Sequence, residues 1–278
     1  MTAAMQSGRL PRQAFWVVGL VAALSGAHAR GQDEREISQA LSDFRKTIRN
    51  AKVDEQIVEA IKTLGQKQHP KILDEWEKVL PKVKPEHRLY VVAEIRKYVE
   101  SSDARKILLD ALSEEGGRAQ VNARGQDVFH ETACEILRAL KDLKTPPEKR
   151  EHSVLVGLLR HDNISLSSTA VQVCGELKCW AAVDPLLGLL RDLEQSEAKP
   201  PNLGDPNGGG QFVRRGGTPS PSQDLAPDQL RQLIQYRRRS ELPGSIRATL
   251  SYMFGETKKN HAEYSDYWKA NRDRLIGK

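Results

Sequence analysis

The sequence predicts an all-α fold, an α-solenoid of about five helix pairs, on three observations. The segment LVGLLR at 155–160 recurs 31 residues later as LLGLLR at 186–191, and a fixed offset of this size indicates stacked units. Charged residues make up 29% of the chain and aromatic residues only 5%, which suits a solvated helical array better than a sandwich or barrel. No stretch shows the sustained alternation of apolar and polar residues that a half-buried strand needs.

Residues 1–29 have the pattern of a secretory signal peptide. Arg9 and Arg12 form a basic segment, an apolar run follows at 14–24, and Ala27-His28-Ala29 supplies a small–x–small cleavage pattern. The run is shorter than the ~20 residues that a membrane-spanning helix needs. An uncleaved anchor or a buried helix is the alternative. We therefore expect an exported chain, periplasmic or extracellular.

Residues 30–196 are predicted to carry the repeated helices. Each unit comprises two short amphipathic helices, because the segment between the two matching copies places Ala170, Val173, Cys174 and Leu177 on one helical face. The same pattern recurs upstream at offsets of 110 and 78 residues. The predicted helices cover 33–49, 53–65, 70–82, 86–100, 103–113, 127–142, 149–160, 166–177, 181–195, 227–240, 244–255 and 262–275.

Particular residue types indicate where these helices begin and end. Asp103 and Asn163 are predicted N-caps. Gly65 and Gly175 suit places where neighbouring helices approach closely or where a helix nears its end. Prolines also fall near five predicted helix starts, where a missing N–H costs little: Pro70, Pro85, Pro146, Pro185 and Pro227.

The segment 197–227 interrupts the array. It is rich in proline and glycine and nearly free of large apolar residues, so it cannot bury enough surface to offset its ordering entropy. We expect a flexible insertion there. Helices are predicted in 228–278, where Gly255 is followed by Tyr264, Tyr267 and Trp268. This segment resembles the closing segment of exported bacterial HEAT-repeat proteins, and the resemblance implies a tryptophan-bearing helix that covers the apolar end of the array.

The clearest unit carries a family resemblance, on Asp162, Ala170, Gly175, Leu177, Ala182-Val183, Pro185-Leu186-Leu187 and Leu189-Leu190. These residues resemble the short bacterial HEAT repeat, which also occurs in phycobilisome-lyase-like proteins. The resemblance covers most of 33–195 and implies a HEAT/armadillo-like superhelix. Leu166-Ser167 stands where the family often has Val-Arg. Family members are mostly binding scaffolds, and lyase activity belongs to a minority.

The sequence marks no catalytic or cofactor site. His130-Glu131 is followed by Cys134 where a zincin helix has its second histidine, so no metal site is predicted. Neither a nucleophile elbow nor a phosphate-binding loop occurs. In a lyase, Asp127 and Glu131 could serve as acid or base, but nothing distinguishes them. We expect no enzyme, no cofactor and no small-molecule substrate, and we expect solvated histidines at 69, 87, 152, 161 and 261.

The three cysteines, Cys134, Cys174 and Cys179, are expected to be small buried hydrophobic residues. An odd number does not favour a fully paired set in an oxidising compartment. A disulfide between neighbouring helices is the alternative, and the sequence does not decide between them.

A basic cluster is the main candidate for binding a partner, comprising Arg214, Arg215, Arg231, Arg237, Arg238 and Arg239. Cations at the C-terminal end of a helix, complementing its dipole, are the alternative explanation. Without residues 1–29 the chain has 41 basic and 37 acidic residues, and this net +4 does not call for nucleic acid.

A signal peptide followed by a helical array predicts an extracytoplasmic scaffold that binds another protein or an anionic surface. The second helix of each pair should line the concave face of the array. These helices are 53–65, 86–100, 127–142, 166–177 and 244–255. The alternative is a HEAT-based lyase or a nucleic-acid-binding protein that uses the basic 231–239 region.

Overall fold

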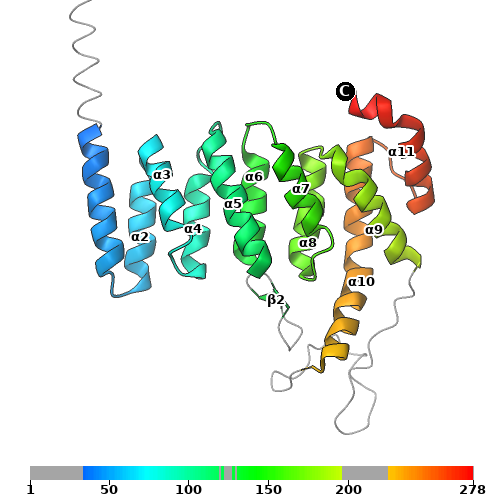
Figure 1. The fold of residues 1–278 in the computed structure, drawn as a ribbon, viewed down its shortest axis with the longest axis horizontal. Coiled ribbons are helices and arrows are strands. Elements are labelled where there is room, and N and C mark those ends of the chain that lie inside the picture. The colour runs from blue at the N-terminus through cyan, green and yellow to red at the C-terminus, as the bar shows by residue number, and fades with distance from the viewer. Residues whose placement is uncertain (1–33, 119, 122–126, 129, 196–224, 278) are drawn as a thin grey trace, which may run out of the picture. The chain divides into compact units, whose positions relative to one another are not determined.

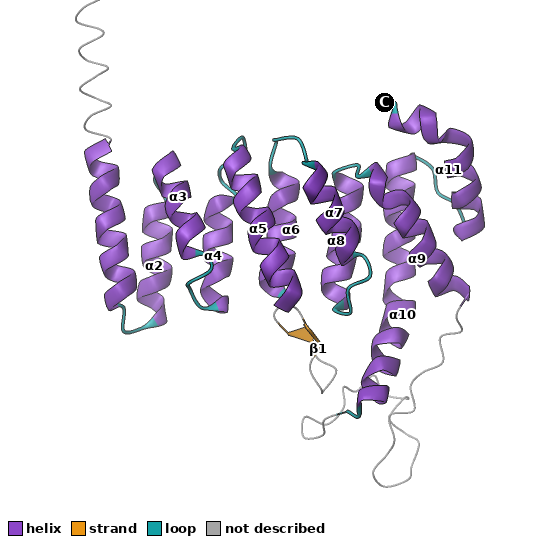
Figure 2. Ribbon diagram, viewed as in Figure 1, coloured by secondary structure: helices purple, strands orange, loops and turns teal. Residues whose placement is uncertain are grey.

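The computed structural model describes residues 34–118, 120–121, 127–128, 130–195 and 225–277 (Figures 1 and 2). The predicted signal peptide and most of the predicted insertion, with Arg214 and Arg215, lie outside the described residues. The chain forms two compact units, Met1–Glu75 and Trp76–Lys278, and each is considered by itself. The fold is helical, as predicted, apart from one very short strand pair.

The N-terminal unit contains a helix over 34–50, α2 (Asp54–Gly65) and the first part of α3 (Pro70–Val79). The guanidinium of Arg45 donates to the buried carboxylate of Glu75 with an Nε–Oε1 distance of 2.8 Å, which ties the 34–50 helix to α3. The apolar faces of the three helices supply the buried residues Ile37, Leu41, Phe44, Ile61, Leu64, Ile72 and Leu73.

The C-terminal unit contains α4 (Pro85–Ile95), α5 (Ser102–Arg118), α6 (Glu131–Asp142), α7 (Lys149–Leu158), α8 (Ile164–Glu176), the 3-10 helix η1 (Trp180–Ala182), α9 (Val183–Gln195), α10 (Pro227–Phe254) and α11 (His261–Ile276). Helices α4, α6, α8 and α10 pack each on the next and form one layer (Figure 1). Helices α5, α7 and α9 pack on that layer, and α11 packs on α9.

The sequence located most helix starts, with three corrections. Pro70, Pro85 and Pro227 are the first residues of their helices, and the side chain of Asn163 accepts the Leu166 N–H at 3.0 Å, as an N-cap does. The prediction that Asp103 caps α5 was wrong: α5 begins at Ser102, and the Oγ of Ser101 accepts the Ala104 N–H at 3.2 Å.

The predicted helix at 127–142 begins later than expected, at Glu131. Its first residues lie instead in β2 (Asp127–Val128), which pairs antiparallel with β1 (Gln120–Val121). Two residues per strand are too few for any period-two pattern to show in the sequence.

Helix α10 joins two helices that were predicted separately, at 227–240 and 244–255. Pro243 lies inside it and removes one backbone hydrogen bond, a change that costs a helix ~3 kcal/mol. The helix continues through the proline because its second half is held by burial: Leu242, Ile246 and Leu250 are fully buried where α10 packs on α8 and α9.

A buried arginine joins α5, the α6–α7 loop and α7. Both oxygens of the Glu151 carboxylate accept from Nη1 of Arg105, at 2.7 and 2.6 Å. Nη2 donates to the carbonyls of Leu143 and Thr145, and Nε donates to the Thr145 hydroxyl. Arg105 is 1% exposed and Glu151 0%, so the pair belongs to the core.

The C-terminal end of the unit is covered by α11 through an aromatic stack. Trp268 is 3% exposed and lies between Trp180 and Phe254, with ring centroids 6.0 and 5.8 Å away and planes inclined by 8° in both cases. Its indole N–H donates to Asp184 at the start of α9, at 2.8 Å. The tryptophan that the sequence placed in a closing helix therefore packs against η1 and α10 and bonds to α9.

None of the helices in the described part of the chain combines the length and the apolar character that crossing a membrane requires.

Candidate functional site

The layer of α6, α8 and α10 has a shallow groove of about 850 Å³. All three helices belong to the set of second helices that the sequence predicted to line a binding face. The groove is lined by Lys141 and Asp142 from α6, Gln172, Gly175 and Glu176 from α8, and Gly244, Ser245, Ala248, Thr249 and Tyr252 from α10.

The floor of the groove forms where α8 and α10 come closest. A Cβ atom at Gly175 would lie 2.8 Å from Cγ2 of Thr249, so only glycine fits there without a shift of its neighbour. The hydroxyl of Thr249 donates to the carbonyl of Val171 at 3.3 Å, which fixes the register of the two helices. The sequence predicted Gly175 at a close approach or a helix end, and both descriptions apply, since α8 ends at Glu176.

The charges at the edge of the groove are paired across helices. Lys141 of α6 and Glu176 of α8 form an ion pair at 3.1 Å. Asp142 pairs with Arg96, whose Nη1 also donates to Glu135 at 3.2 Å. Positive and negative side chains lie side by side along this edge, so the groove is polar but has neither a mainly positive nor a mainly negative surface. It therefore favours a partner surface of mixed character over a polyanion.

Tyr252 is the exposed large hydrophobic residue of the groove, with 62% of its surface accessible. Ser245, Ala248 and Tyr252 follow one another at i, i+3 and i+7, so they share one face of α10. An exposed tyrosine beside a floor of small residues presents a large amphipathic ring with few rotatable bonds. This is the residue type that protein interfaces use as an anchor.

The predicted basic cluster is largely paired within the chain. Arg238 is 14% exposed, lies 3.6 Å from Asp162 and donates to the carbonyl of Arg160 at 3.0 Å. Burial lowers the pKa of Arg238, and the neighbouring Arg160 adds to this effect while Asp162 opposes it. The side chain thus fastens α10 to the α7–α8 turn. It does not extend into solvent as a free cation for a partner.

Two further arginines of the cluster have partners one turn away on α10. Arg231 lies 3.8 Å from Asp228, and Arg237 donates through Nε to Glu241 at 3.2 Å. The structure therefore leaves less unpaired positive charge in this region than the count of arginines suggested.

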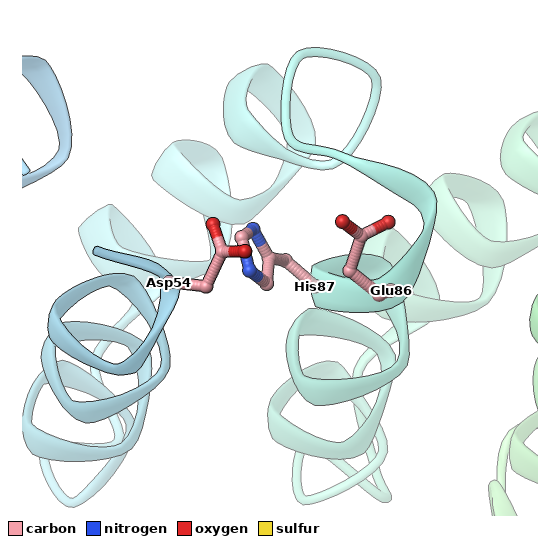
Figure 3. Close-up of side chains that lie close together, drawn as sticks. All are labelled: Asp54, Glu86 and His87. Carbon is pink, nitrogen blue, oxygen red and sulfur yellow. The ribbon is translucent and has the colours of Figure 1, made fainter. Parts of the chain in front are cut away.

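The histidine environments differ from the expectation at His161 and His87. His161 is half-buried, and its ring nitrogens bond to the carbonyl of Gly116 and to the N–H of Asn163, at 3.0 Å each. His87 was expected to be solvated but is 2% exposed, in the first turn of α4. Figure 3 shows it next to Glu86, together with Asp54, the first residue of α2. Asp54 belongs to the other unit, so the three residues define no site of either unit. Within each unit, the described residues contain no group of three metal-ligating side chains.

The two acids considered for a lyase, Asp127 and Glu131, lie on different elements. Glu131 is exposed at the start of α6, and Asp127 lies in β2. Glu131 does not line the groove.

Comparisons of the chain with protein-family models, with curated proteins and with solved structures found no significant match.

Sequence reasoning predicted a binding face on the layer where the groove lies but did not predict the groove itself. Tyr252 precedes the buried residues Met253 and Phe254, and nothing in that apolar run shows which ring faces solvent. The exposed face of α10 is decided by α8 and α9 packing on its other sides. Gly175 was the available signal, since its close approach to Thr249 fixes the floor.

Proposed function

We propose that this chain is an exported scaffold of the HEAT type that binds another protein through the groove between α6, α8 and α10. The observation that carries the proposal is the groove itself, which combines a floor of small residues, paired charges and the exposed ring of Tyr252. It lies on the layer where a helical-repeat array presents its binding face.

The packing in the C-terminal unit supports the HEAT/armadillo-like solenoid on which this proposal rests. Each helix of the α4, α6, α8, α10 layer contacts the next, and α5 and α7 pack on that layer. Contacts between successive units only are the defining property of repeat arrays. The residue pattern of 154–191 adds the family resemblance.

The groove can be tested with a matched pair of tyrosine variants. The full chain, tagged at its C-terminus, is recovered from its native cell envelope after crosslinking, and the captured protein is identified. Replacing Tyr252 by Ala should weaken binding of that protein about 30-fold, the effect of losing an interface anchor. Tyr90→Ala, at the other exposed tyrosine, lies outside the groove and should leave affinity unchanged.

Two outcomes would count against the proposal. One is equal binding by the Tyr252 and Tyr90 variants, which would move the interface elsewhere. The other is a reporter, fused after residue 35, that stays in the cytoplasm, because export would then fail. A salt-dependent shift of duplex DNA by the cytoplasmic chain would favour the nucleic-acid alternative.

A further inference from the structure

Helix α8 ends in a Schellman motif that places two cysteines opposite each other. The N–H of Cys179 donates to the carbonyl of Cys174 at 2.8 Å, and the N–H of Lys178 donates to the carbonyl of Gly175 at 3.0 Å. Lys178 has a φ of 50°, the left-handed conformation that this cap requires. In such a motif the side chains at the positions of Cys174 and Cys179 face each other.

The backbone geometry fits a covalent link between these two residues. Bond lengths and the 2.8 Å hydrogen bond together limit the Cα–Cα distance of Cys174 and Cys179 to less than about 6.7 Å. Disulfides span Cα–Cα distances of about 4.4–6.8 Å. Both residues are 0% exposed, so other residues of the chain enclose them and separate them from solvent. Cys134, the third cysteine, lies on α6 beside the hydroxyl of Thr169.

We propose that Cys174 and Cys179 form an intrachain disulfide that locks the C-terminal end of α8 when the chain meets a thiol oxidant. The oxidant is a disulfide, either of a dithiol oxidase or of a small thiol such as glutathione. This inference goes beyond the proposed function and does not depend on the groove. The adjacent residues Gly175 and Glu176 line the groove, so the link would also stiffen its edge.

In the folded turn the two thiols are unequal, because a hydrogen bond from Cys174 and the backbone N–H groups of Ala182 and Ala181 lower the pKa of Cys179. The same hydrogen bond and burial raise the pKa of Cys174. Both thiols are buried in the folded chain, so the oxidant reaches them while the turn is still open, during folding or local opening.

The chemistry balances in two displacement steps. The deprotonated sulfur of one cysteine of the pair attacks one sulfur of the oxidant, and that S–S bond breaks to release a thiolate, which takes up a proton. The other cysteine then loses its proton and attacks the chain sulfur of the mixed disulfide, which releases the second thiol. One S–S bond forms in the chain, and the oxidant gains two electrons and two protons.

The test uses the purified full chain, folded with oxidised glutathione or with dithiothreitol. Each sample is denatured, alkylated and mapped by mass spectrometry. After oxidation we expect label on Cys134 only and a linked peptide that joins Cys174 to Cys179; after reduction all three should be labelled. Cys134→Ala should leave the link intact, whereas Cys174→Ala should abolish it.

Three results would overturn the proposal: label on all three cysteines after oxidation, a link that includes Cys134, or glutathione left on Cys174 or Cys179 as a mixed disulfide. Because the link closes a loop of only six residues, oxidation should lower the unfolding equilibrium constant by roughly 40-fold, measured in urea. Since glutathione is supplied in the tube, failure of export would not affect this result, and failure of the link would not affect export.

Discussion

Two joins in the C-terminal unit use an arginine–carboxylate pair in opposite ways. Between α5 and α7, Arg105 and Glu151 are fully buried. Between the α7–α8 turn and α9, Arg160 and Asp192 meet at 2.8 Å, with side chains 59% and 42% exposed. The same chemistry therefore serves as part of the core in one place and as a surface contact in the other.

The difference lies in how the arginine is satisfied. Taking a guanidinium and a carboxylate out of water costs several kcal/mol for each ion. All five N–H groups of Arg105 have acceptors, and the acceptors other than Glu151 belong to Leu143 and Thr145. The buried pair thereby fixes one conformation of the α6–α7 loop. The side chain of Arg160 is 59% exposed and remains accessible to solvent, so it constrains the backbone less. The contact between the α7–α8 turn and α9 therefore depends on apolar packing around η1 and α9.

The largest expected effect comes from breaking the buried pair on one side. Replacing Glu151 by Gln leaves the Arg105 charge buried without its counter-ion. The free energy of unfolding should fall by about 3–5 kcal/mol, measured by circular dichroism in urea. Asp110→Asn is the matched control, because Asp110 pairs with Arg150 between the same two helices at 2.6 Å but is 48% exposed. Equal losses for the two variants would contradict the comparison.

The second-largest loss in the free energy of unfolding is expected at the aromatic stack around Trp268, at the C-terminal end of the unit. Replacing Trp268 by Ala removes the ring between Trp180 and Phe254 together with the donor to Asp184. We expect a loss of about 3 kcal/mol, the lower end for a buried tryptophan, because Trp180 is itself only half-buried and can close part of the gap. Trp268→Phe should recover most of this loss, since it keeps the stack and loses only the indole N–H. A fully stable Trp268→Ala variant would show that α11 is not needed to cover α9.

The closest helix contact should give a smaller effect. Replacing Gly175 by Ala places a methyl group 2.8 Å from Cγ2 of Thr249, so the Thr249 side chain or helix α10 must shift. Overpacking of this kind costs about 1–3 kcal/mol. Gly157→Ala is the control: this glycine lies inside α7, and an added Cβ there meets nothing within 4 Å. The control should be neutral or slightly stabilising. The prediction fails if both variants behave alike.

The sequence predicted the helical fold because apolar periodicity and helix-start residues such as Pro85 and Asn163 are local signals. Pro243 is the exception. A proline tends to end a helix, and a break was predicted there, but the helix continues because Leu242 and Ile246 are buried. Buried ion pairs were missed for a related reason. Glu151 stands in the run Lys149-Arg150-Glu151, where one charge is buried and its neighbours are exposed, and only the packing of α5 separates them.

The candidate site shows the same limit. The sequence placed a binding face on the second helices, and the groove lies on three of them. It also singled out Arg238 as a contact for a partner, although the side chain is used to hold α10 against the α7–α8 turn. A count of charges cannot show which of them already have a counter-ion within the fold.

The smallest effect is expected at the exposed pair. Arg160 lowers the pKa of Asp192. The pair therefore stabilises the fold above the unfolded pKa of aspartate, about 3.9, and this contribution disappears as the pH falls through the lower folded pKa. Because Asp192 is 42% exposed, solvent and salt screen the pair, and Asp192→Asn should cost less than about 1 kcal/mol at pH 7. In urea titrations the difference from the unmodified chain should shrink as the pH falls below about 3.9, and it should also shrink in 1 M salt. If the variant instead loses as much stability as Glu151→Gln, burial is not what distinguishes the two joins.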